Sequence, residues 1–94
     1  MSFISVSHWD TTEWTDAMEA LARYKYVPMV MALGAQSVNM VRTGDLSFVV
    51  VTTYADETAA DAAQARIDAI REEAAEELPM QMTSVHRGST FASG

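Results

Sequence analysis

The sequence predicts an α+β domain of order β-α-β-β-α-β, with a four-stranded antiparallel sheet and two helices on one face. Three observations support this prediction. Short stretches of strand-like residues stand at both ends of the chain, a glycine-containing hairpin joins two β-branched runs in the middle, and a long alanine-rich helix follows the hairpin. With 94 residues, the chain is expected to form a single domain over residues 1–94.

The N-terminal residues predict a strand followed by a helix start. Residues 3–8 alternate apolar and small polar side chains, so we expect a strand with Ile4 and Val6 on one face. Asp10 precedes Glu13 by three residues, which is the spacing of a capping box with Asp in place of Ser or Thr. A helix is therefore expected to begin directly after this pair.

The first helix is expected to be interrupted. Its apolar spacing continues to about Arg23, but Pro28 disfavours helical geometry at the residue before it. We therefore predict a break over residues 24–27 and a second short helix over residues 28–33, with Pro28 in its first turn. Gly34 is placed to end this helix in the left-handed conformation.

A hairpin is predicted between strands at residues 37–42 and 47–54. We expect a two-residue turn centred on Gly44 and Asp45, since both residue types tolerate positive φ. Pairing outward from this turn places Val41 opposite Phe48. One face of the hairpin is then aliphatic and suited to lie under the helices: Val38, Met40, Val49 and Val51.

The other face of the predicted hairpin is mixed but too apolar to stand in water. It consists of Ser37, Asn39, Val41, Phe48, Val50, Thr52 and Tyr54. Because both helices already cover the first face, the simplest cover for this one is the sheet of a second, identical chain. A one-residue change in the turn would exchange the faces while leaving the need for a cover.

The second helix is predicted from a cap at Asp56 to about Leu78, where Pro79 ends it, and a last strand follows at residues 81–87. Its apolar residues recur every three or four positions: Ala60, Ala63, Ile67, Ile70, Ala74 and Leu78. The charged residues are expected to face water: Arg66, Arg71, Glu72, Glu73 and Glu76. The many alanines predict close approach of this helix to the sheet.

Composition limits the classes of partner. The formal net charge of -7 disfavours nucleic acid and anionic membrane surfaces. The sequence has no cysteine, so thiolate metal sites and disulfides are excluded. No apolar run is long enough to span a membrane, and the N-terminus lacks the features of a signal peptide, so a cytoplasmic location is expected. An apolar content of 49% is high for so short a chain and agrees with burial against a second copy.

Two segments carry a family resemblance. Ser47–Ala63, SFVVVTTYADETAADAA, combines an aromatic-ended strand, an acidic cap and a helix, and Tyr26–Val38, YVPMVMALGAQSV, links the first helix to the second strand. This pattern resembles the dimeric α/β-barrel superfamily, which has a ferredoxin-like fold and includes antibiotic-biosynthesis-monooxygenase-like and muconolactone-isomerase-like proteins. The resemblance implies a homodimeric barrel with a cleft between sheet and helices or inside the barrel.

The haem-degrading members of that superfamily are not matched. They use an Asn on the first strand, a Trp at the end of the third strand and a His on the second helix. Here the corresponding segments carry Ser5 and Ser7, Tyr54, and Ala62 and Ala63. Haem degradation is therefore not expected, and we predict no cofactor.

The candidate catalytic residues are His86, Asn39 and Tyr54, which the predicted strand faces bring together. A histidine titrating near neutral pH can accept a proton, and Asn39 or Tyr54 could stabilise an oxyanion. Tyr24 and Tyr26 flank the helix break and are placed to line an entrance. The candidate ligand-binding residues are Ser7, His8, Tyr24, Tyr26, Phe48, Thr52 and Ser84. A partly exposed strand-end position and simple core packing are the alternative interpretations for these histidines and aromatic residues.

The leading hypothesis is an enzyme or binding protein for a small organic molecule, with aromatic compounds among the candidates. The resemblance implies cofactor-free oxygenation or isomerisation if the protein is an enzyme. The rival hypothesis is a non-catalytic homodimer whose interior is packed. Two histidines without metal-ligand spacing predict no metal site.

Overall fold

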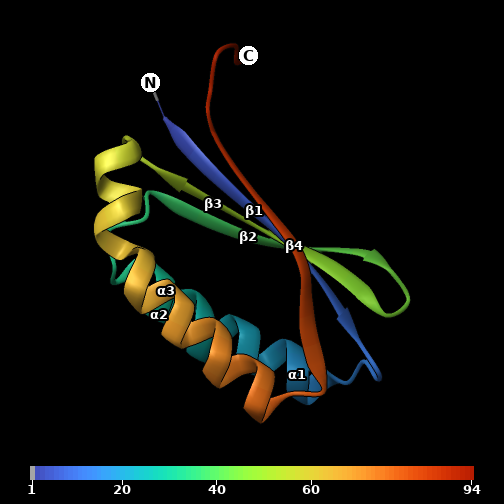
Figure 1. The fold of residues 1–94 in the computed structure, drawn as a ribbon. Coiled ribbons are helices and arrows are strands. Elements are labelled where there is room, and N and C mark those ends of the chain that lie inside the picture. Colours follow the sequence, from blue (N-terminus) through green and yellow to red (C-terminus); the bar gives the residue numbers. More distant parts are fainter. Residues whose placement is uncertain (1) are drawn as a thin grey trace.

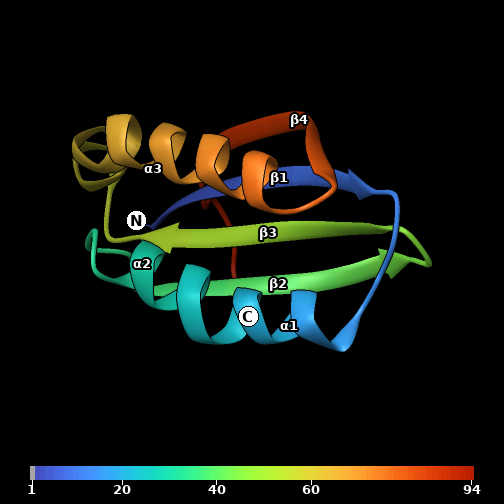
Figure 2. The ribbon, with the colours of Figure 1, turned by 90° about the horizontal axis from the view of Figure 1, so that it is seen from below.

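The computed structural model describes residues 2–94 and contains one four-stranded sheet. Its elements are β1 (Phe3–Thr11), α1 (Asp16–Leu21), the π-helical segment η1 (Ala22–Tyr26), α2 (Val27–Met31), β2 (Ser37–Gly44), β3 (Ser47–Tyr54), α3 (Glu57–Glu77) and β4 (Met80–Ser89). The strands are antiparallel in the order β2-β3-β1-β4. Figures 1 and 2 show the helices together on one face of the sheet. The predicted element order and architecture are confirmed.

Strand β1 is longer than predicted, because it continues past His8 to Thr11. Its odd-numbered residues, from Phe3 onward, are buried and face the helices. Ile4 and Val6 share a face as predicted, but it is the face opposite the helices. The residue that extends the strand is Trp9, whose ring stacks parallel to that of Phe48 with centroids 6.0 Å apart.

The predicted capping box is wrong because Asp10 belongs to the sheet. Asp10 pairs with Ser47 of β3 and Gln81 of β4. The helix cap is instead Thr15, whose side-chain oxygen accepts a hydrogen bond from the Met18 N–H at 3.2 Å. Burial of the Trp9 indole keeps the residues around Asp10 in β1, so the helix begins later in the sequence than predicted.

The predicted helix break is replaced by a π-helical segment. In an α-helix the ring of Pro28 would collide with the carbonyl four residues earlier, and Pro28 has no N–H to donate. Segment η1 widens the helix just before Pro28, and the Val27 N–H donates to the Ala22 carbonyl five residues back. The chain therefore stays helical from α1 to α2. Gly34, with φ of 97°, ends this helical run in the left-handed conformation, as predicted.

The hairpin turn lies one residue later than predicted, at Asp45 and Leu46. A register shift between Arg42 and Gly44 accompanies this change, and neither Gly44 nor Asp45 adopts positive φ. The Arg42 guanidinium donates hydrogen bonds to the carbonyls of Gly44 at 3.1 Å and Asp45 at 2.8 Å. These bonds satisfy turn carbonyls without the left-handed geometry that the prediction assumed.

Because the turn lies one residue later, the pairing of β3 with β2 differs from the predicted register by one residue. Val41 pairs with Val49 and Arg42 with Phe48, in place of the predicted Val41–Phe48 pair. The helix-facing side of β2 is therefore as predicted, but the two faces of β3 are exchanged. Phe48, Val50, Thr52 and Tyr54 face the helices, and Val49, Val51 and Thr53 face away from them.

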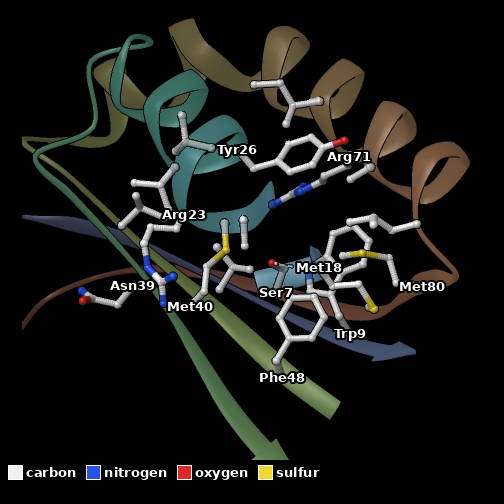
Figure 3. A pocket seen from close by; sticks show the side chains of 18 of the residues that line it. Ser7, Trp9, Met18, Arg23, Tyr26, Asn39, Met40, Phe48, Arg71 and Met80 are labelled. Carbon is white, nitrogen blue, oxygen red and sulfur yellow. Dashed lines mark hydrogen bonds between the residues drawn. The ribbon is translucent and has the colours of Figure 1, made fainter. Parts of the chain in front are cut away.

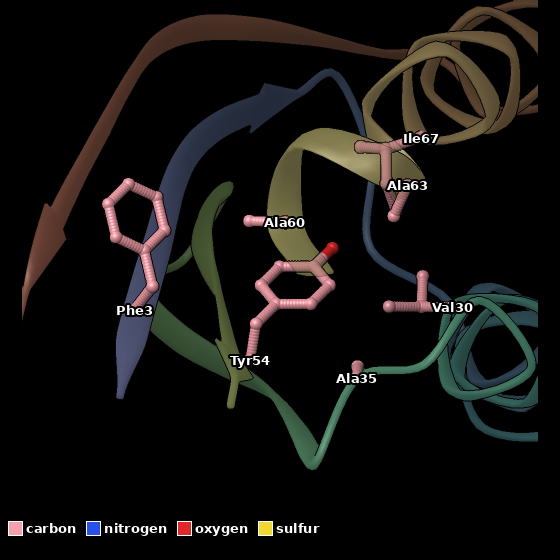
Figure 4. Packing of buried hydrophobic residues seen from close by; sticks show 7 residues of the cluster. All are labelled: Phe3, Val30, Ala35, Tyr54, Ala60, Ala63 and Ile67. Carbon is pink, nitrogen blue, oxygen red and sulfur yellow. The ribbon is translucent and has the colours of Figure 1, made fainter. Parts of the chain in front are cut away.

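The predicted cap of helix α3 is confirmed, and its apolar stripe packs toward the sheet. The Asp56 side chain accepts a hydrogen bond from the Ala59 N–H at 2.8 Å and caps α3. Small residues on α3 let it approach Tyr54, which is only 3% exposed. Figure 4 shows the resulting core at the end of the sheet where β3 leads into α3. Its buried residues are Phe3, Val30, Ala35, Tyr54, Ala60, Ala63 and Ile67.

Candidate functional site

The other end of the helix–sheet interface holds a cavity of about 410 Å³. Its floor is the helix-facing side of β1, β2 and β3, and its walls are the helical run α1–η1–α2 and the C-terminal half of α3 (Figure 3). Cavities of this size hold small organic ligands in many proteins. A cleft between sheet and helices is one of the two positions that the family resemblance implies.

Aromatic rings form one end of the cavity. The stacked rings of Trp9 and Phe48 are within 6° of parallel, and Trp14 meets Phe48 edge-on with ring centroids 5.9 Å apart. Trp14 lies just before α1 and is half-buried in the cavity lining. These flat faces are shaped to pack against a planar ligand.

Buried hydroxyl groups lie on the cavity floor. The Ser7 hydroxyl accepts a hydrogen bond of 2.9 Å from the Trp9 indole N–H, which fixes the indole in the plane seen in Figure 3. Thr52 is buried on the neighbouring strand. Both residues were predicted as ligand contacts, and both lie in the cavity lining.

Tyr26 connects the π-helical segment to the end of α3. Its hydroxyl donates a short hydrogen bond to Glu77, which Lys25 also contacts with its ammonium group at 2.9 Å. Burial, followed by the hydrogen bond to Glu77, raises the pKa of Tyr26 to about 12. The hydrogen bond from Lys25, followed by that from Tyr26, lowers the pKa of Glu77. This cluster holds one wall of the cavity against the other.

Four charged residues line the cavity: Glu19, Arg23, Arg42 and Arg71. Glu19 accepts a hydrogen bond of 2.7 Å from the Trp14 indole N–H, and the Arg42 guanidinium lies 4.3 Å from the centroid of the Trp14 ring. Figure 3 shows the guanidinium of Arg71 directed into the cavity. The prediction that Arg71 faces water is therefore wrong.

The three predicted catalytic residues do not come together. Tyr54 is buried in the core on the helix side of the sheet. His86 pairs with Val6 and Asn39 with Val51, which places both on the opposite face. Asn39 is exposed on the edge strand at the rim of the cavity, so it is not the buried amide that the sequence suggested. The one-residue change in the hairpin causes this separation.

The remaining predicted ligand contacts divide between the two faces. Tyr26 and Phe48 line the cavity, together with Ser7 and Thr52. His8 and Ser84 are on the opposite face, where the imidazole rings of His8 and His86 meet edge-on with centroids 6.2 Å apart. Tyr24 is 75% exposed and lies outside the lining.

The candidate ligand contacts predicted from the sequence did not include Trp9 and Arg71, which both line the cavity. Trp9 continues the odd-numbered buried side of β1, so extending the alternation by one step would have found it. Arg71 stands four residues after Ile67 and three before Ala74, on the same stripe as the predicted apolar residues. Because Arg71 is charged, we expected it to face water, although its position on the helix places it at the helix–sheet interface.

Within residues 2–94 there is no group of three or more side chains that could hold a metal ion. None of the helices in this part of the chain is long and apolar enough to cross a membrane.

No protein-family model and no curated protein matches the chain. Solved structures do match it over almost its whole length.

The similar structures are distant in sequence. Rv0793 from Mycobacterium tuberculosis has 12% identity and a TM-score of 0.65, covering 99% of this chain and 98% of that one. NE2512 from Nitrosomonas europaea, described as a protein of unknown function, has 20% identity and a TM-score of 0.66, covering 100% and 94%. A dimeric ferredoxin-like protein from an uncultured marine organism has 13% identity and a TM-score of 0.53, covering 99% and 93%. The fold of this chain is therefore ferredoxin-like.

Proposed function

We propose that this protein binds a flat organic molecule in the cavity between its sheet and its helices. The observation that carries the proposal is an open volume of about 410 Å³ that ends on the stacked rings of Trp9 and Phe48. Such volume favours ligand binding over the rival hypothesis of a packed, purely structural interior. The buried hydroxyl groups supply the few polar contacts that would orient a ligand.

Oxygenation or isomerisation without a cofactor, the chemistry that the resemblance implies, needs a proton acceptor beside the ligand. His86 points away from the cavity, so it could serve only a ligand held on the opposite face of the sheet. The proposal for the cavity is therefore binding, and His86 and Asn39 remain proposed for a site that a second chain would enclose.

We also propose that two copies pair through the sheet face opposite the helices. Ile4, Val6, Val49 and Val51 form an apolar centre there, and Val41 beside them is 48% exposed. A second copy presents the same face and can bury it symmetrically. The similar structure from a marine organism is described as dimeric, which supports this proposal.

Sedimentation equilibrium at micromolar concentration tests the pairing. We expect a dimer for the natural chain and a monomer for Val51→Lys, because an unpaired ammonium group would enter the apolar centre. Ala62→Lys, on the exposed side of α3, is the matched control and should remain dimeric. A natural chain that is monomeric under these conditions would contradict the proposal.

The binding proposal is tested through the two tryptophans of the chain, Trp9 and Trp14, which both line the cavity. N-phenyl-1-naphthylamine, a neutral aromatic probe, should quench their fluorescence in a saturable manner. Ala22→Phe fills the cavity from η1 and should weaken this probe at least about tenfold. Ala17→Phe adds the same ring on the exposed side of α1 and should change nothing. Equal affinity in the two variants would show that the probe does not enter the cavity.

A further inference from the structure

We infer that the natural ligand of the cavity is an organic anion and that Arg71 binds its acidic group. The inference rests on the proposed ligand-binding function and names the chemical class of the ligand: a planar, largely apolar body that bears a carboxylate, sulfonate or similar oxyanion.

The charges around the cavity are the reverse of those of the whole protein. The chain has 6 basic and 13 acidic residues and a net charge of -7. Yet Arg23, Arg42 and Arg71 line the cavity, half of all the basic residues, while among residues 2–94 Glu19 is the one acidic residue that does so. Glu19 already accepts the indole N–H of Trp14. The interior of the cavity is therefore positive and attracts anions.

Arg71 is the least exposed of these three cations. Its side chain is only 18% exposed, and its ion-pair contact within the described residues is to Asp68 Oδ1 at 3.7 Å, too long for a hydrogen bond. Asp68 itself is largely in solvent, with 60% of its side chain exposed. A guanidinium withdrawn from water without a close partner is costly, and the carboxylate of a ligand would supply that partner.

The other two arginines of the cavity lining, Arg23 and Arg42, are both exposed. Arg42 donates to the two turn carbonyls and covers the Trp14 ring, and Arg87 binds the Asp61 carboxylate at 2.7 Å outside the cavity. Burial, the largest influence on Arg71, lowers its pKa, as expected for a cation held out of water. Arg71 is thus the guanidinium of the cavity lining that is most withdrawn from water.

The positions of these groups define the shape of the ligand. Aromatic rings close one end of the cavity, and Arg71 reaches into it from α3, beneath the ring of Tyr26 (Figure 3). A planar body can lie against Trp9, Phe48 and Trp14 while an oxyanion accepts two parallel N–H bonds from the guanidinium.

Two probes that differ only in charge test the inference. 1-Anilinonaphthalene-8-sulfonate and N-phenyl-1-naphthylamine share one ring system, and only the first carries a sulfonate. Quenching of Trp9 and Trp14 reports both inside the cavity. In the natural chain the anionic probe should bind more tightly. Arg71→Gln should weaken the anionic probe about tenfold or more and change the neutral probe less than about twofold.

Arg66→Gln is the control, because Arg66 lies on the same helix, exposed and outside the cavity lining. It should leave both affinities unchanged. Arg71→Lys keeps the charge and should retain more of the anionic binding than Arg71→Gln, which also guards against a glutamine variant that folds poorly. Circular dichroism verifies the fold of each variant.

The outcomes separate the two claims. If the neutral probe binds and Arg71→Gln leaves the anionic probe unchanged, or weakens both probes equally, the role of Arg71 is overturned while the binding function stands. If neither probe quenches the tryptophans of the natural chain, the proposed function fails, and the inference fails with it.

Discussion

The two ends of the helix–sheet interface differ in how closely the helices approach the sheet. At one end, Ala60 and Ala63 of α3 lie directly against the Tyr54 ring, and the space is filled. At the other end, the parallel rings of Trp9 and Phe48 and residues of the π-helical segment line the cavity, and about 410 Å³ remains open. Bulky apolar side chains are present at both ends, so the size and orientation of these side chains contribute to where the cavity forms.

The contrast also assigns different roles to α3 and to the helical run α1–η1–α2. The small residues of α3 stabilise the fold by permitting close packing, whereas η1 gives up regular helical geometry beside the cavity. Local π-helical turns are often found at functional sites. The packed end is therefore expected to determine stability, and the open end to determine binding.

The largest expected effect is at the packed end. Tyr54→Ala should lower the free energy of unfolding by about 3–5 kcal/mol, because a buried ring is removed and a cavity is left. Met18→Ala, at the half-buried lining of the open end, should cost only about 1–2 kcal/mol. Urea denaturation of both variants measures the difference. Equal losses would show that the two ends are packed alike.

Enlarging a side chain should destabilise the protein at the packed end and be tolerated at the open end. Ala63→Leu has no room beneath α3 and should lower the free energy of unfolding by about 1–3 kcal/mol through overpacking. Ala22→Phe extends into open volume, so we expect a change of less than about 1 kcal/mol. Thermal and urea unfolding check both values. A severe loss in Ala22→Phe would mean that the cavity is closed in solution.

A smaller effect than the loss at Tyr54 is expected at the contact that joins the two walls of the cavity. Because the pKa of Tyr26 is raised from 10.0 to about 12 in the folded protein, its contribution to stability is complete below pH 10 and is lost as the pH rises toward 12. Tyr26→Phe should remove this alkaline loss, which we expect to be on the order of 1–2 kcal/mol.

Tyr24→Phe is the control for this pH dependence, since the exposed Tyr24 ring makes no comparable bond to Glu77. Urea denaturation at several pH values from 8 to 12 gives the comparison for both variants. An alkaline loss that persists in Tyr26→Phe would assign the effect to another group.

The architecture was predictable because periodicity and turn residues mark the elements independently of one another. The alanine stripe of α3, its Asp56 cap and the left-handed Gly34 all followed from local rules. The turn did not, because the choice between Gly44–Asp45 and Asp45–Leu46 depends on Arg42 bonding to the turn carbonyls and on Phe48 stacking against Trp9. The stacking of Phe48 against Trp9 joins segments that are distant in sequence.

The one-residue error in the predicted turn accounts for most of the differences between the predicted site and the observed one. It placed Phe48 and Thr52 on the same face as Asn39 and His86, although the first two lie in the cavity and the others on the opposite face. Arg71 was assigned to water by its charge. Its burial depends on the open volume beside it, and an open volume leaves no periodic signal in a sequence.

The central claim is that a ligand enters the cavity rather than the opposite face of the sheet. The most direct measurement is a nuclear magnetic resonance titration with N-phenyl-1-naphthylamine, following the indole N–H signals of Trp9 and Trp14 and the imidazole signals of His8 and His86. The structure predicts saturable shifts of both indole signals while both imidazole signals stay in place. Shifts of the imidazoles without the indoles would contradict the claim and move the site to the opposite face.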